Sequence, residues 1–178
     1  MMMMARARGP WPMVGMIAAA AGMASTITQI VERIQLSANP HAHLLCNISK
    51  LISCSNVLLA PQSSVFRPIP NAAIGLAMFS VFITAFAVAA SKSSISAGLG
   101  RAMQFLMLVM LAFVTWFMWQ TAYFIHALCL YCTVIATATV VVNLAWWKIT
   151  HRRAGMETLL AVGFWALLAA FVFYGLWT

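Results

Sequence analysis

Long apolar stretches decide what this chain of 178 residues can fold into. A bilayer core about 30 Å thick needs roughly 20 apolar residues per helix, because the backbone must satisfy its own hydrogen bonds there. Charged residues make up only 7% of the chain, whereas soluble domains contain about 25%, so a soluble fold is excluded. We therefore expect an all-α polytopic membrane protein, with residues 1–178 as a single membrane domain. Its expected transmembrane helices are approximately Met13 to Val31, Ala72 to Ala90, Ala102 to Phe124, Leu128 to Trp147 and Leu159 to Trp177.

The ten Lys and Arg residues indicate topology, although the net charge is +8. They are scattered at the ends of the apolar stretches and form no basic face for phosphates, so we expect no nucleic-acid partner. Positive residues accumulate on the cytoplasmic side, which predicts a cytoplasmic-membrane protein with its N-terminus inside and an extracytoplasmic loop over residues 33–70. The inner side would hold Arg6, Arg8, Lys92, Arg101, Lys148, Arg152 and Arg153, and the outer side Arg33, Lys50 and Arg67.

The first apolar stretch has an alternative interpretation as a signal peptide, because Arg6 and Arg8 precede it and small residues follow. An uncleaved anchor is favoured for two reasons. The stretch is long for the apolar region of a signal peptide, and its removal would place the next loop on the wrong side of the membrane. The only acidic residues, Glu32 and Glu157, fall at helix ends where water is within reach. We assign neither of them to catalysis.

Two connections carry all four cysteines. The loop over residues 33–70 is polar but contains apolar residues at near-helical spacing between Leu44 and Leu59, a pattern typical of a short amphipathic helix on the bilayer surface. The second connection is hidden in the uncharged segment from Ala102 to Trp147, which is long enough for two crossings. We expect a tight outer turn near Tyr123 to Ala127, which brings both cysteine pairs to one side of the membrane.

Cys129-Leu130-Tyr131-Cys132 forms a C-x-x-C motif at an expected helix start. One helical turn puts both sulfurs on the same face, where free N–H groups and the helix dipole stabilise a thiolate. This arrangement is suited to redox cycling. Alternatives are a passive structural disulfide or two free thiols in helix packing.

Cys46 and Cys54 lie eight positions apart. That spacing corresponds to about 12 Å of rise in an unbroken helix, whereas disulfide-bonded cysteines have Cα atoms at most about 7 Å apart. If these two cysteines bond, Asn47 to Ser53 must bend. We therefore predict a loop there, with a helix that begins near Cys54. Thiol–disulfide exchange between the two pairs could then pass electrons to a lipid-soluble acceptor.

These residues resemble the vitamin K epoxide reductase family, in particular its stand-alone bacterial homologues of the actinobacterial type. The resemblance runs from Cys46 to Trp147. It is carried by Cys46 with Cys54-Ser-Asn-Val-Leu-Leu-Ala-Pro-Gln-Ser-Ser-Val-Phe, by Pro70-Asn71-Ala-Ala-Ile-Gly75, and by Leu128-Cys-Leu-Tyr-Cys132. It implies a four-helix bundle core around a quinone, with a fifth transmembrane helix outside it. The chain departs from the family at Ala60, where a serine is common, and at Arg67-Pro68, where a glycine is usual.

The resemblance also implies residue roles. Cys46 and Cys54 would form the shuttle pair, Cys129 would exchange with it, and Cys132 would lie beside the quinone. Asn71 resembles an asparagine that hydrogen-bonds a quinone oxygen, although a helix N-cap is an alternative for a residue at this place.

Single residues near the cysteines are candidates for further roles. Tyr131 is a candidate wall of the quinone pocket, although interfacial aromatics also serve as membrane anchors. His126 could tune the thiolates or move a proton, or be an ordinary interfacial residue. His41 and His43 precede Cys46, but the spacing matches no tetrahedral motif, and we expect no metal.

We therefore predict a quinone-dependent thiol oxidoreductase that uses menaquinone or ubiquinone. It would reoxidise an extracytoplasmic thioredoxin-fold (DsbA-like) partner, which in turn forms disulfide bonds in exported proteins. One alternative is a quinone or vitamin K epoxide reductase on the same scaffold. Another is a membrane scaffold or transporter with structural disulfides, in which the cysteine pairs never exchange.

Overall fold

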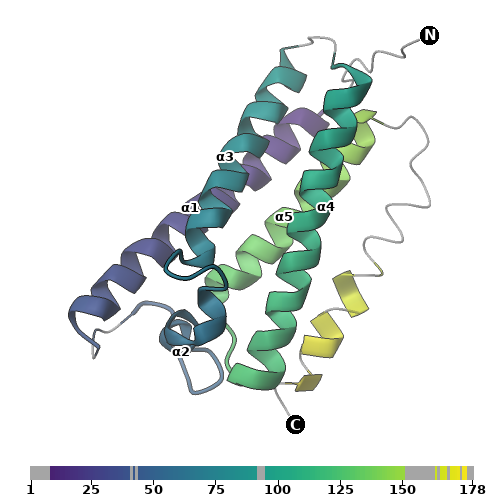
Figure 1. Ribbon diagram of the computed structural model, residues 1–178. Coiled ribbons are helices and arrows are strands. Elements are labelled where there is room, and N and C mark those ends of the chain that lie inside the picture. The colour runs from purple at the N-terminus through teal and green to yellow at the C-terminus, as the bar shows by residue number, and fades with distance from the viewer. Residues whose placement is uncertain are drawn as a thin grey trace.

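The fold is a bundle of long apolar helices (Figure 1). The computed structural model describes residues 9–40, 42, 44–91, 95–150, 163, 165–167, 169–172 and 174–175, and these contain no β-strand. Four helical segments in this part of the chain are long and apolar enough to cross a membrane, which confirms the all-α polytopic membrane class. They are α1 (Trp11–Ala38), α3 (Asn71–Ala90), α4 (Ala97–Gln120) with its continuation to Ile125, and α5 (Leu130–Thr150).

Helix α1 packs along both α3 and α5, while α4 packs mainly on α5. Glycines on α1 allow it to lie close to α3. A Cβ atom at Gly22 would collide with the ring of Phe79, and one at Gly15 with the ring of Phe86. Small residues let helices approach in this way where lipid removes the usual hydrophobic driving force. The C-terminal half of α1, which carries Gln29 and Glu32, contacts the start of α5.

The turn between α4 and α5 lies where the uncharged segment predicted it. A π-helical turn over Thr121–Ile125 extends α4, and His126 ends it with a left-handed backbone (φ 52°). Ala127 then donates its N–H to the carbonyl of Thr121 at 3.2 Å. After Leu128 and Cys129, α5 begins at Leu130.

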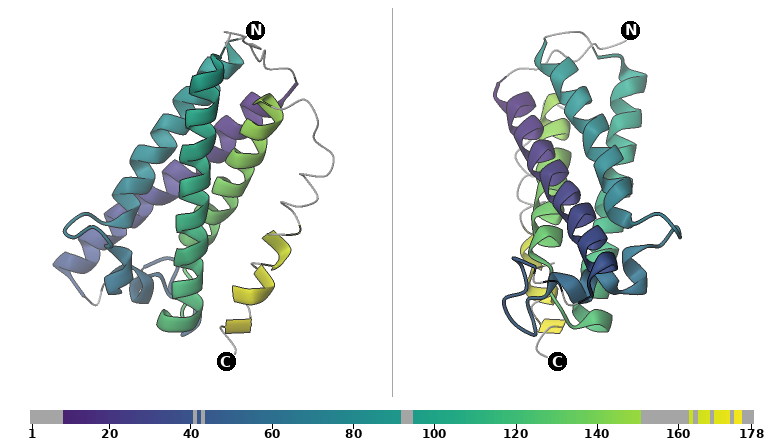
Figure 2. Two further views of the ribbon diagram at one scale, coloured as in Figure 1. Left: turned by 45° about the vertical axis from the view of Figure 1, so that its right-hand side comes forward. Right: turned by 90° about the vertical axis from the view of Figure 1, so that its left-hand side faces the viewer.

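The connection from Asn39 to Pro70 covers one end of the bundle (Figure 2). Its helical parts are α2 (Cys54–Leu59) and the 3₁₀ turn Pro61–Ser63. The apolar spacing before Cys54 does not form a surface helix, because Leu45 and its neighbours adopt turns and bends. Helix α2 starts at its N-cap Ser53, whose hydroxyl accepts from the N–H of Asn56 at 3.4 Å.

The fifth expected helix, over residues 159–177, is described in part. The described residues between Gly163 and Gly175 are helical, and the hydroxyl of Tyr123 donates to the carbonyl of Phe171 at 3.1 Å. Several residues used in the sequence predictions lie outside the described part of the chain: Arg6, Arg8, His41, His43, Lys92, Arg152, Arg153 and Glu157. The predicted orientation of the N-terminus stays a prediction.

Candidate functional site

The loop cysteines Cys46 and Cys54 are joined by a disulfide with their Cα atoms 5.7 Å apart. The chain between them is not helical, and α2 begins at Cys54 itself, which confirms the predicted loop. Asn47 closes this loop: its side-chain carbonyl accepts from the N–H of Ser55 at 3.2 Å, and its amide donates to the Ser55 hydroxyl at 3.0 Å. The second cysteine pair is different, because Cys129 and Cys132 are free thiols, both buried.

Cys129 stands at the N-terminus of α5, immediately before the first helical residue. Its carbonyl accepts the N–H of Thr133 at 3.1 Å, and its sulfur accepts the N–H of Cys132 at 3.4 Å. The pKa of Cys129 is lowered, chiefly by the hydrogen bond from the Cys132 thiol, which outweighs the effect of burial. Backbone N–H groups and the amide of Gln29 lower it further. Cys129 is thus the cysteine of the pair that is prepared to be a thiolate.

Backbone hydrogen bonds tie the disulfide loop to the C-x-x-C motif. Leu128 donates its N–H to the carbonyl of Leu51 at 2.7 Å, and Ser53 donates its N–H to the carbonyl of Leu128 at 3.1 Å. These bonds form a parallel bridge between Ile52, two residues before Cys54, and Leu128, which directly precedes Cys129. The structure therefore brings the two cysteine pairs together, as an electron relay requires.

Gln29 of α1 contacts both free thiols and was not identified from the sequence. Its side-chain nitrogen lies 3.2 Å from the sulfur of Cys132 and 3.7 Å from that of Cys129, and only 6% of the residue is exposed. An amide N–H that donates to sulfur stabilises a thiolate relative to a thiol. One side chain from a distant helix therefore serves both members of the pair.

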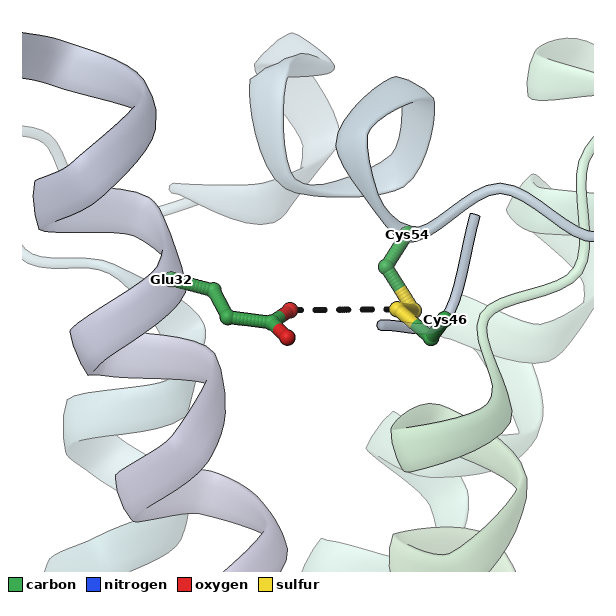
Figure 3. A group of neighbouring side chains, drawn as sticks. All are labelled: Glu32, Cys46 and Cys54. Atoms are coloured by element: carbon green, nitrogen blue, oxygen red, sulfur yellow. Dashed lines mark hydrogen bonds between the residues drawn. A yellow bond between two sulfur atoms is a disulfide. The ribbon is translucent and has the colours of Figure 1, made fainter. Parts of the chain in front are cut away.

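Glu32 is also buried, with 6% of its surface exposed, so the expectation of nearby water was wrong. The reason is that α1 continues to Ala38 and is covered by the disulfide loop. One carboxylate oxygen of Glu32 accepts from the hydroxyl of Tyr131 at 3.0 Å. The other lies 3.8 Å from the sulfur of Cys46 and points toward the disulfide (Figure 3).

The oxygen of Glu32 and the sulfurs of Cys46 and Cys54 all lie within 4.8 Å of one another. Cysteine binds metals as the thiolate. In the disulfide state neither sulfur is a thiolate, so the cluster offers one carboxylate beside a covalent bond. In this state the cluster is the carboxylate of Glu32, which can accept or donate a proton, beside the disulfide of Cys46 and Cys54.

An apolar cavity of about 330 Å³ lies between the helices beneath the 3₁₀ turn, within the size range of ligand pockets. Cys132 reaches its wall, whereas Cys129 does not. Arg33 also reaches it and donates to the hydroxyl of Ser63 at 2.7 Å. An apolar space with few polar groups fits a quinone ring. Besides Cys132, the polar side chains that line the cavity are Thr26, Gln29, Arg33, Ser63 and Asn71.

Asn71 is the first residue of α3 and lines the cavity. Its side-chain amide donates to the carbonyl of Gln62 at 2.7 Å, and its carbonyl accepts from the N–H of Val65 at 3.0 Å. The N-cap alternative was wrong, because the cap position falls on Pro70 and no side chain caps the helix. Asn71 instead fastens the loop over the cavity.

Tyr131 and His126 do not reach this cavity. Tyr131 turns toward Glu32, and His126 is exposed in the left-handed turn before the C-x-x-C motif. Their contact with a quinone stays a prediction. The sequence did contain a signal for the residues that were missed: Thr26, Gln29 and Arg33 repeat at helical spacing on an otherwise apolar helix, and all three line the cavity.

Comparison with known proteins agrees with this geometry. No curated protein matches the chain. The family model described as "Vitamin K epoxide reductase family" matches residues 13–147. This range contains both cysteine pairs and, apart from the first two residues of α1 and the last three of α5, the four candidate membrane-spanning segments of the described part. Membership of the stand-alone actinobacterial branch stays a prediction. The chain belongs to the vitamin K epoxide reductase family, whose members are membrane oxidoreductases that use quinones.

Proposed function

We propose that the protein is a quinone-dependent thiol oxidoreductase that reoxidises an extracytoplasmic thioredoxin-fold (DsbA-like) protein. That partner would in turn form disulfide bonds in exported proteins. One observation carries the proposal: the backbone bridge at Leu128 holds a disulfide loop against a C-x-x-C motif whose second cysteine lines an apolar cavity. A structural disulfide needs neither the neighbouring free pair nor the cavity.

The reaction is a sequence of balanced two-electron steps. The partner's dithiol reduces the disulfide of Cys46 and Cys54 and becomes a disulfide itself. The loop dithiol then reduces the disulfide of Cys129 and Cys132. Two electrons and two protons finally leave Cys129 and Cys132 for the quinone, which supplies a lipid-soluble acceptor and departs as the quinol. The bonded loop pair and free C-x-x-C pair correspond to the state before this last step.

Different residues of the chain have different roles in this electron transfer. Cys132 lies in the cavity wall, so we assign to it the exchange with the acceptor and to Cys129 the exchange with the loop. Gln29 stabilises the thiolates through its amide. Arg33 and Asn71 would orient the quinone oxygens, because their polar groups lie at an otherwise apolar wall. Menaquinone and ubiquinone both suit such a wall.

The position in the cell follows from the chemistry. Disulfides persist outside the cytosol, so we place the disulfide loop on the extracytoplasmic face of the cytoplasmic membrane, with the N-terminus inside. The loop presents an apolar rim to its surroundings, where Leu45 is 93% and Ile48 66% exposed next to Cys46. This rim would be the contact for the thioredoxin-fold partner.

The test uses purified protein in detergent with a reduced thioredoxin-fold protein and a soluble quinone. Cys132→Ala is expected to abolish oxidation of the partner while the protein remains inserted in the membrane. Thr137→Ala, an exposed change on the same helix, is the matched control and should retain activity. Continued quinone-dependent oxidation of the partner by Cys132→Ala would refute the role assigned to this cysteine.

The same preparation separates the proposal from its rivals. A quinone epoxide reductase would consume epoxide in the presence of a dithiol faster than it oxidises the partner with quinone. A scaffold with structural disulfides would give no mixed disulfide between a loop cysteine and a soluble thiol protein. Either result would replace the proposed function.

A further inference from the structure

The reaction proposed above assigns no role to the buried carboxyl of Glu32. One of its oxygens nevertheless lies 3.8 Å from the sulfur of Cys46. Acidic side chains are rarely buried without a partner or a task. The hydroxyl of Tyr131 occupies one oxygen, and the other points at Cys46 (Figure 3). The guanidinium of the neighbouring Arg33 donates to the hydroxyl and the carbonyl of Ser63, at 2.7 Å and 3.4 Å.

The two loop cysteines have different surroundings. The residue before Cys54 is hydrogen-bonded to the residue before Cys129, so Cys54 is the loop cysteine tied to the C-x-x-C motif. Cys46 lies on the side of α1, against Glu32. This asymmetry assigns the exchange with Cys129 to Cys54 and leaves Cys46 as the cysteine that resolves the resulting mixed disulfide.

We propose that Glu32 is the general base that takes the proton from the Cys46 thiol in this resolving step. The inference rests on the proposed function. The Cys54 thiolate first attacks the sulfur of Cys129, forming a Cys54–Cys129 bond and releasing Cys132 as the thiolate. Cys46 then passes its proton to Glu32 and attacks the sulfur of Cys54. The Cys46–Cys54 bond forms, the Cys54–Cys129 bond breaks, and Cys129 leaves as the thiolate.

Protons and electrons balance over the exchange. The two protons of the loop dithiol end on the two cysteines of the C-x-x-C motif, and two electrons move with them. The structure has the product arrangement of this step, with Cys46 and Cys54 bonded and the carboxyl still 3.8 Å from Cys46. That separation suits a thiol donor, because sulfur is larger than oxygen or nitrogen. Tyr131 fixes the carboxyl by holding its other oxygen.

The experiment is a single turnover of the full chain in detergent. All four cysteines are reduced with dithiothreitol, the dithiothreitol is removed, and one equivalent of menadione is added. Samples are then quenched with acid, alkylated and mapped for disulfides. Glu32→Gln keeps the size of the side chain and removes the base. We expect its resolving step to slow by about 100-fold or more, the lower range of general base catalysis, and the Cys54–Cys129 disulfide to accumulate.

Companion variants separate catalysis from folding. Glu32→Asp retains a carboxylate and should restore part of the rate, whereas Ser37→Ala, an exposed change on the same helix, should match the wild type. Tyr131→Phe leaves the base in place and should slow the step less than Glu32→Gln. Raising the pH should accelerate Glu32→Gln more than the wild type, because Cys46 then ionises without a base. The ionisable groups near the Glu32 carboxyl in the described chain are Tyr131 of α5 and Cys46 and Cys54 of the loop.

Two failures are distinguishable. If the wild type forms the Cys46–Cys54 disulfide at the same rate as Glu32→Gln, with no mixed disulfide in either, the role of Glu32 is overturned while the relay stands. If the wild type itself transfers no oxidation from Cys129 and Cys132 to the loop, the proposed function fails first.

Discussion

Removal of the Gln29 amide is the most direct test of how α1 controls the thiol pair. Gln29→Leu keeps most of the side-chain volume and deletes the donor that lies 3.2 Å from Cys132 and 3.7 Å from Cys129. A hydrogen bond to a charged group contributes about 1.5–3 kcal/mol. The longer contact and the sulfur acceptor favour the lower end of that range.

Only part of the lost hydrogen-bond energy appears in the activation barrier for thiol–disulfide exchange. In thiol–disulfide exchange about half of a difference in thiolate stability is expressed in the transition state. A loss of about 1.5–3 kcal/mol then becomes about 0.8–1.5 kcal/mol in the barrier, which corresponds to a rate about 4-fold to 12-fold lower. The expected direction is slower release of Cys132 when the loop dithiol attacks the C-x-x-C disulfide, because a less stable thiolate is a poorer leaving group.

The assay is stopped-flow exchange followed by alkylation and peptide mapping of the four cysteines. Gln104→Leu is the matched control, because Gln104 also donates to a side chain of α5, Asn143, far from the thiols. If Gln29→Leu transfers electrons as fast as the wild type, or if Gln104→Leu is slowed equally, the amide does not stabilise the thiolates and the reasoning is refuted.

Three further changes probe the bundle, the loop and the thiolate. Gly22→Ala forces a methyl group into an aromatic ring of α3 and should cost about 1–3 kcal/mol, measured as a lower midpoint of thermal unfolding in detergent. Asn71→Ala releases the loop over residues 62–65 and should raise the KM for quinone more than it lowers kcat. Cys132→Ala removes the main cause of the lowered pKa of Cys129, so the Cys129 thiolate should form only at higher pH, monitored by its Cβ chemical shift. An unchanged titration would contradict that cause.

The sequence alone was sufficient for the membrane class and for the approximate positions of α3 and α5. Apolar runs of about 20 residues have few alternatives in a bilayer, so α3 and α5 begin and end within three residues of their expected bounds. In contrast, α4 begins five residues before Ala102, and α1 continues seven residues beyond Val31. Local geometry was equally decisive for the loop between Cys46 and Cys54, because a disulfide across an unbroken helix is impossible at that spacing. The C-x-x-C motif at a helix start followed from the uncharged segment around it.

Only the tertiary structure decided which partners the cysteines have. Gln29 contacts Cys132, and Glu32 contacts Tyr131, because the polar side of α1 faces α5, about 100 residues away in the chain. The same side of α1 brings Glu32 next to Cys46 of the loop. That rotation depends on close packing at Gly22 and on the cover of the disulfide loop, which are interactions between distant segments. Hydropathy records which residues enter the membrane, but not which face of a helix meets its neighbour, and the acid–base chemistry of this site depends on that face.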